Sequence, residues 1–105
     1  MQYRIRYTPG AQKDMEQVWY GVLEASGSTE IADRYVDDFA DKIAEKKKYP
    51  ETGSPLYYRG LVTGFYSLNF KAYKAFYRIK EPYIEVIRIL LAKSDYMKTI
   101  FGEED

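Results

Sequence analysis

The chain has 105 residues, a length that predicts one domain, 1–105, able to bury a core without cross-links. Its 16 basic and 16 acidic residues cancel, so the net charge points to no class of partner. The sequence contains no Cys and no His, which excludes disulfides, thiol nucleophiles and the commonest transition-metal ligands, so we expect neither a metal nor a cofactor.

The chain begins with a short predicted strand followed by a helix. Residues 3–7 alternate apolar and basic side chains, the pattern of a half-buried strand. Thr8 is a suitable N-cap and Pro9 suits the first helical position, so we expect a helix from here to about Ala25. Apolar residues spaced three and four apart along this stretch predict one buried face.

A second helix is predicted after the Ser-Gly-Ser break at 26–28. Apolar residues recur at three- and four-residue steps from Ile31 to Ile43, while aspartates occupy the other side, which is the normal solvated face of an amphipathic helix. The three lysines at 46–48 lie where the carboxyl end of the helix favours cations, and we expect Tyr49-Pro50 to end it.

The C-terminal half predicts an antiparallel sheet. The Pro- and Gly-rich segment 49–56 is read as the connector from helix to sheet, and strands are expected near 62–70, 72–80 and 83–91 with tight turns between them. The last strand is apolar on both faces and should be central. We therefore predict an α+β fold of order β-α-α-β-β-β, with a helical hairpin on a small, mainly antiparallel sheet and a short C-terminal helical turn.

Basic residues are concentrated in the predicted sheet. Residues 56–98 carry eight Lys or Arg against three acids. Side chains alternate between the faces of a strand, so Lys74, Phe76, Arg78 and Lys80 should share a face that displays positive charge. This arrangement favours a polyanion or an acidic partner, although a solvated strand face also collects lysines.

Three sequence features carry a family resemblance. They are Pro50-x-x-Gly53-x-Pro55-Leu56, the strand AYKAFYRI at 72–79, and Ser94-Asp95-Tyr96 after the last strand. In this order, behind a strand and a Pro-capped helix, they resemble the RelE/ParE superfamily of bacterial toxins, of the plasmid-stabilisation type. The resemblance implies a type II toxin that arrests growth and is silenced by a cognate antitoxin, whose disordered C-terminal segment wraps around it.

The superfamily contains two activities. RelE-like members cut mRNA bound to the ribosome, whereas ParE-like members poison DNA gyrase without evident hydrolytic chemistry. The resemblance to RelE-like enzymes implies Lys74, Lys93 and Tyr96 as catalytic residues. Asp95 replaces a histidine of those enzymes, and Lys74 lacks the bidentate fork of the arginine that it replaces. Both targets therefore remain open, and metal-independent mRNA cleavage is one alternative.

Further residues are candidates for contacting nucleic acid or another target. Cations and aromatic rings are the side chains that hold phosphates and stack on bases, and they occur here together. The candidates are Arg59, Tyr66, Lys71, Arg78 and Arg88. Ordinary packing explains many of the tyrosines equally well. A third alternative is a non-toxic protein- or RNA-binding domain on the same fold.

The sequence shows no membrane or export signal. The N-terminus lacks an apolar stretch of signal-peptide length, and no run approaches the roughly 20 apolar residues of a membrane span. We therefore expect a cytoplasmic protein with no membrane partner.

Overall fold

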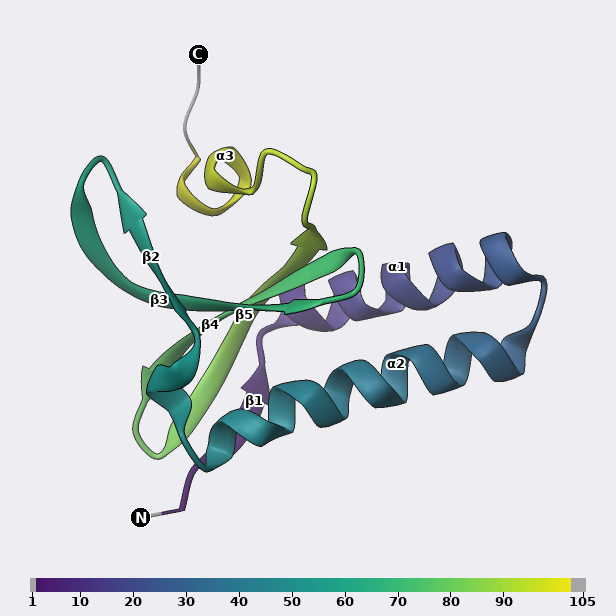
Figure 1. Ribbon diagram of the computed structural model, residues 1–105, viewed down its shortest axis with the longest axis horizontal. Helices are drawn as coiled ribbons and strands as arrows, with labels where there is room; N and C mark the ends of the chain where they lie inside the picture. Colours follow the sequence, from purple (N-terminus) through teal and green to yellow (C-terminus); the bar gives the residue numbers. More distant parts are fainter. Residues whose placement is uncertain (1, 103–105) are drawn as a thin grey trace.

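The computed structural model describes residues 2–102, in which a helical hairpin covers one side of a five-stranded sheet (Figure 1). The elements in chain order are β1 (Arg4–Tyr7), α1 (Pro9–Ser26), α2 (Thr29–Ala44), the 3-10 helices η1 (Glu45–Lys47) and η2 (Pro50–Thr52), β2 (Ser54–Tyr58), β3 (Leu61–Phe70), β4 (Tyr73–Lys80), β5 (Tyr83–Leu91) and α3 (Tyr96–Phe101). This arrangement confirms the predicted α+β class. No helix within 2–102 is both long and apolar enough to cross a membrane.

The strands lie in the order β1-β5-β4-β3-β2, with β1 parallel to β5 and every other pair antiparallel. Strand β5 lies between β1 and β4, as its apolar sequence predicts. Because β1 pairs with β5, the first and last strands of the chain meet in the sheet. Side chains separated by almost 80 positions in the sequence thus become neighbours.

Both helices begin where the sequence predicts. The Thr8 hydroxyl accepts a hydrogen bond from the Ala11 N–H at 3.1 Å and donates one to the Ile87 carbonyl at 2.9 Å. The N-cap of α1 is therefore also tied to β5. Ser28 caps α2 by accepting from the Ile31 N–H at 3.2 Å, directly after Gly27 has turned the chain in a left-handed conformation.

The segment from 45 to 58 differs from the prediction. Helix α2 ends at Ala44, earlier than expected, and η1 continues the chain with a tighter turn. The predicted connector contains an additional strand, β2, which pairs with β3 at the edge of the sheet. Pro55 led to the connector interpretation, but an edge strand tolerates a residue without an N–H because only one of its sides is paired. The order is thus β-α-α-β-β-β-β, one strand longer than predicted.

The main core lies between the helices and the sheet. Its fully buried members include Val18, Phe39, Ile43, Tyr77 and Ile84. The strand residues that flank core residues point the other way, onto a face that α1 and α2 leave uncovered. We call it the outer face, and it comprises Arg6, Asn69, Lys74, Phe76, Arg78 and Glu85.

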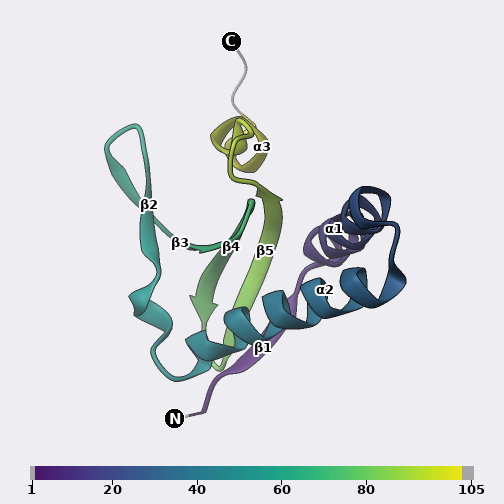
Figure 2. The same ribbon diagram turned by 45° about the vertical axis from the view of Figure 1, so that its right-hand side comes forward.

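Helix α3 covers part of the outer face. It lies beyond the end of β5, apart from α1 and α2 (Figure 2). Tyr96 packs on Phe76 with ring centroids 5.1 Å apart, and Phe101 stacks on Tyr58 at 4.3 Å. Phe76 is fully buried, which corrects the expectation that it belongs to an open charged face. The reason is a second, smaller aromatic cluster that the C-terminal helix completes.

Candidate functional site

Lys74 and Tyr96 lie together on the outer face. The Lys74 ammonium is 5.8 Å from the centroid of the Tyr96 ring and donates a 2.7 Å hydrogen bond to the Asn69 side-chain oxygen. Strand β4 positions the lysine, whereas the packing of Tyr96 on Phe76 at the start of α3 positions the tyrosine. Two of the three predicted catalytic residues are thus brought together. The third, Lys93, is exposed in the turn between β5 and α3.

Three charged residues form a row across the neighbouring part of the outer face. Glu85 on β5 is the register partner of both Arg6 on β1 and Arg78 on β4. One carboxylate oxygen lies 2.9 Å from Arg6 Nη2, and the other lies 2.7 Å from Arg78 Nε and Nη2. We call this row, Arg6–Glu85–Arg78, the Glu85 clamp. It places one carboxylate between two guanidinium groups.

The Glu85 side chain is only 11% exposed, whereas those of Arg6 and Arg78 are 41% and 43% exposed. Burial raises the pKa of Glu85, but the hydrogen bonds and positive charges of Arg78 and Arg6 outweigh it, so the pKa lies below its ordinary value. Glu85 is therefore ionised at neutral pH. Its charge offsets the positive potential of the two arginines on the outer face.

Arg88 is committed to a different carboxylate, on α1. Its Nε and Nη2 donate hydrogen bonds of 2.7 and 3.1 Å to the two oxygens of Asp14, and these bonds raise the pKa of Arg88. Asp14 also accepts the Ile89 N–H at 2.9 Å, at a position of β5 beyond the end of its pairing with β1. The predicted target-binding Arg88 thus joins α1 to the edge of the sheet.

The other predicted binding residues are dispersed. Tyr66 stacks on Tyr77 on the helix-covered side of the sheet, with ring centroids 5.5 Å apart. Lys71 lies at the β3–β4 turn with its ammonium 4.8 Å from the Tyr35 ring, and Arg59 is exposed at the β2–β3 turn. The set does not form one surface. Of these five side chains, Arg78 lies on the outer face beside Glu85, and Arg88, the register partner of Phe76, turns to Asp14 at the sheet edge.

Sequence reasoning missed the partners that neutralise the arginines. The alternating pattern of residues 3–7 gives Arg6 no particular role, and the largely apolar pattern of residues 83–91 gives none to Glu85. A lone acid within a predicted central strand was the available signal, because a buried carboxylate requires a cationic partner. The sequence does not show which cations these are.

A family model supplies the identification. The model of the ParE toxin of the type II toxin–antitoxin system parDE matches residues 5–96. The chain belongs to the ParE toxin family. The protein is thus the toxin component of a type II toxin–antitoxin module, as the sequence resemblance implied. A search of curated proteins finds no match.

Solved structures similar to this ParE toxin share its fold at low sequence identity. The chromosomal ParDE toxin–antitoxin system of P. aeruginosa matches with a TM-score of 0.73 and 19% identity over 88% of this chain and 98% of that one. A mutant of the E. coli toxin RelE in the free state matches at 0.66 and 16% over 99% and 100%. The RelBE2 toxin–antitoxin complex of Mycobacterium tuberculosis matches at 0.57 and 22% over 87% and 99%.

The Pro50-x-x-Gly53 motif of this ParE toxin has a structural role. The buried Tyr77 hydroxyl donates a 2.6 Å hydrogen bond to the Pro50 carbonyl, and its burial raises the pKa of Tyr77 to about 12. Gly53 lies directly against the phenol. A Cβ at position 53 would come within 2.9 Å of Tyr77 Cζ and 3.0 Å of the Ser67 carbonyl oxygen. The hydrogen bond to Pro50 and the close packing of Gly53 on Tyr77 therefore hold the segment before β2 against the core.

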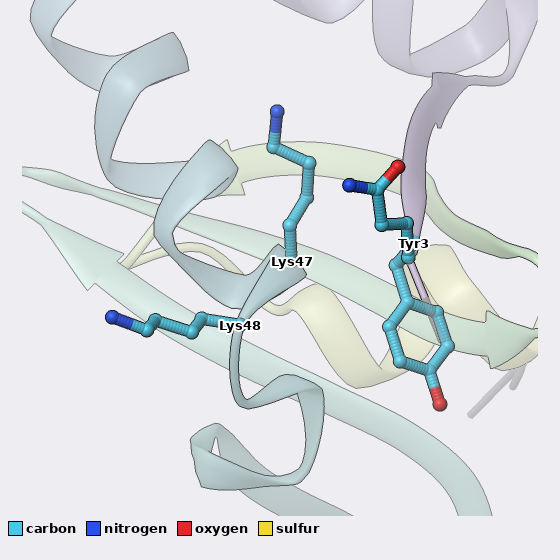
Figure 3. A pocket seen from close by; sticks show the side chains of 4 residues that line it. Tyr3, Lys47 and Lys48 are labelled. Atoms are coloured by element: carbon cyan, nitrogen blue, oxygen red, sulfur yellow. The ribbon is translucent and has the colours of Figure 1, made fainter.

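A cavity of about 460 Å³ lies between the start of β1 and the turn after α2 of the ParE toxin. Gln2, Tyr3, Lys47 and Lys48 line it, but Figure 3 shows that the two lysines extend in different directions and do not converge on one point. The Tyr3 hydroxyl donates to Glu81 at 3.2 Å. Within 2–102, no group of three or more acidic residues is placed to hold a metal ion.

Proposed function

We propose that this toxin arrests growth by binding DNA gyrase and not by cleaving nucleic acid. The observation that carries the proposal is the pairing of Arg6, Arg78 and Arg88 with buried or half-buried carboxylates. When the 2′-hydroxyl of RNA attacks the neighbouring phosphate, extra negative charge develops on that phosphate. An enzyme stabilises this charge with cations that are not already paired with carboxylates. In this toxin the three arginines are already paired, Arg6 and Arg78 with Glu85 and Arg88 with Asp14.

The same carboxylates also oppose phosphate binding directly. A phosphate entering between Arg6 and Arg78 would meet the ionised Glu85 at close range, and like charges in a partly buried site repel strongly. Lys74 remains, but a single ammonium is a point charge without the planar fork that grips two phosphate oxygens. Inhibition by binding requires none of this chemistry, so the arrangement favours a gyrase-directed toxin.

Purified gyrase provides the test. We expect the toxin to inhibit DNA supercoiling by gyrase, and we expect Tyr96→Phe to inhibit equally well because no proton transfer is involved. Lys93→Ala serves as a second variant at a predicted catalytic position. Supercoiling that proceeds unchanged at saturating toxin would contradict the proposal.

One observation favours ribosome-dependent mRNA cleavage as a second candidate. The Lys74 ammonium and the Tyr96 ring meet on the outer face, which would allow a cation to hold a phosphate beside a phenol able to move a proton. In that case Lys74→Ala and Tyr96→Phe should abolish cleavage while the fold survives. We expect these variants to remain toxic instead.

We further propose that a cognate antitoxin with a disordered C-terminal segment binds this toxin in the cytoplasm. Solved toxin–antitoxin complexes are among the proteins that share its fold, including RelBE2 of Mycobacterium tuberculosis. We expect this segment to be acidic or mixed in charge and to contact the face that carries Lys74 and Arg78, mainly through Lys74, because Glu85 already neutralises Arg78. Co-expression should raise the yield and the melting temperature, because a ligand of the folded state stabilises it. An adjacent small protein that neither co-purifies nor protects growth would refute this partner.

A further inference from the structure

A hollow of about 280 Å³ lies between α1 and α2, next to the end of β1. The two helices run side by side in both views of the molecule (Figures 1 and 2). Apolar side chains supply most of the lining, which consists of Tyr7, Gln12, Met15, Val36 and Ala40. We call these five residues the interhelical groove. All but the glutamine are half-buried, so part of their apolar surface faces solvent.

The groove has an acidic rim. Asp33, Asp37 and Asp41 follow one another at four-residue steps, so they form a row on α2 beside the groove residues of that helix. The row faces α1, because the Trp19 indole N–H donates a 2.8 Å hydrogen bond to Asp33. On α1, Glu16 lies one turn after the glutamine of the groove. These four acids are exposed, and we call them the acidic rim.

The basic residues of the two helices lie away from the groove. Arg34 lines a separate hollow together with Lys71 of the β3–β4 turn, and the Lys42 ammonium lies 3.9 Å from a Glu45 carboxylate oxygen. Lys13 is about 100° around α1 from its neighbour in the groove, on the side away from α2. Negative charge therefore predominates along an apolar hollow. An exposed apolar surface with polar edges is typical of an interaction site.

We propose that the interhelical groove binds an amphipathic helix with Lys or Arg beside its apolar face, formed by part of the antitoxin's disordered segment. This inference rests on the antitoxin proposed above and names the surface and the chemistry of the contact. The aspartate row spans about 12 Å of α2, a length that matches apolar anchors at positions i, i+4 and i+7 of a bound helix. Basic residues beside those anchors then lie against the acidic rim.

Other occupants conflict with the acidic rim. A nucleic acid does not fit, because the rim repels phosphates. A second copy related by two-fold symmetry would bring the same acids face to face. A folded target would have to project a helix far enough to enter the groove, whereas a disordered segment acquires its helical shape on binding.

The groove adjoins the outer face at the edge of the sheet. Successive residues of the edge strand β1 point to opposite sides, so Arg6 lies on the outer face while Tyr7 lines the groove. A few extended residues, each spanning about 3.3 Å, suffice to pass around this edge. One antitoxin segment of mixed charge can therefore contact Lys74 with acidic residues and the acidic rim with basic ones.

Reversing the charge of the rim tests the proposal. The rim variant combines Asp37→Lys with Asp41→Lys, and the control variant combines Asp38→Lys with Glu24→Lys, an equal charge change at exposed helix positions. Calorimetry at low and at physiological salt measures the affinity of each for the small protein encoded by the adjacent gene. We expect the rim variant to bind about tenfold or more weakly than the control, because attraction becomes repulsion. Added salt should narrow the gap.

A second pair of variants tests the apolar part of the groove. Ala40→Gln places a larger polar side chain in the groove and keeps a good helix former. Ala25→Gln makes the same change at an exposed position near the end of α1. We expect Ala40→Gln to weaken binding of the same small protein about tenfold, and Ala25→Gln to leave it unchanged. Melting temperatures close to that of the unmodified toxin confirm that the variants fold.

Each other outcome has a definite meaning. If the rim variant and Ala40→Gln bind the small protein as tightly as their controls do, the groove is not its docking site and the proposed antitoxin stands. If the unmodified toxin does not bind the small protein, the proposed antitoxin fails and this inference fails with it. Variants that keep this partner but no longer inhibit gyrase overturn the inference and assign the groove to the target.

Discussion

Replacing Glu85 by Gln removes the one negative charge that joins β1, β5 and β4 on the outer face. Glutamine keeps the size and one acceptor oxygen, but it places an N–H₂ group against a guanidinium and leaves Arg6 and Arg78 facing each other across an uncharged residue. Breaking a fully buried ion pair costs about 3–5 kcal/mol. The arginines here are 41% and 43% exposed and regain water, so we expect about 2 kcal/mol.

For a chain of this length, that loss lowers the melting temperature by about 8 °C. The pH dependence gives a second readout. The pKa of Glu85 is lowered in the folded state, so its stabilisation is present above the ordinary value of 4.5 and is lost as the pH falls further. The stability difference between the toxin and Glu85→Gln should therefore be full at pH 7 and shrink below about pH 4.5.

Urea unfolding of both proteins at several pH values measures this difference, with the exposed Glu24→Gln as a control for charge removal. The variant should also bind single-stranded RNA more tightly, with a steeper salt dependence, because two cations become available to phosphates. A variant as stable as the unmodified toxin at pH 7, or with unchanged RNA binding, would refute the role assigned to the Glu85 clamp.

Three further changes probe the contacts that position the sheet. Gly53→Ala should cost about 1–3 kcal/mol in urea unfolding, since the new methyl group meets the Tyr77 ring; a neutral result would contradict the close packing. The pKa of Tyr77 is raised to about 12 from 10, so stability should fall as the pH rises above 10, and Tyr77→Phe should flatten that loss in alkaline melting curves. Asp14→Asn should destabilise the protein and speed amide hydrogen exchange at Ile89, whereas unchanged exchange would exclude this anchoring role.

Local signals in the sequence were sufficient to predict where both helices begin, but they did not predict every strand of the sheet. Thr8 with Pro9, and Ser28 after Gly27, are caps whose hydrogen bonds lie within a few residues, so the helix starts could be read directly. Strand β2 could not, because its pairing with β3 is settled by tertiary contacts and Pro55 obscures the strand pattern.

The candidate site shows the same division. Lys74 and Arg78 share the face that strand alternation predicts, because that pattern is local. The groups that neutralise the arginines come from far along the chain: Arg6 lies 79 positions from Glu85, and Asp14 lies 74 positions from Arg88. These pairs form only because β1 pairs with β5 and α1 docks on the sheet. No local pattern in the sequence of β5 predicts either contact.

The central claim concerns the target, and one induction experiment tests it most directly. The toxin and its Lys74→Ala variant are expressed in a test bacterium, and mRNA 5′ ends are mapped alongside DNA strand breaks and plasmid supercoiling. We predict broken DNA and altered supercoiling with intact mRNA, for both proteins. Cuts phased with codons in the mRNA, present with the unmodified toxin and lost with Lys74→Ala, would contradict the account and assign the toxin to ribosome-dependent cleavage.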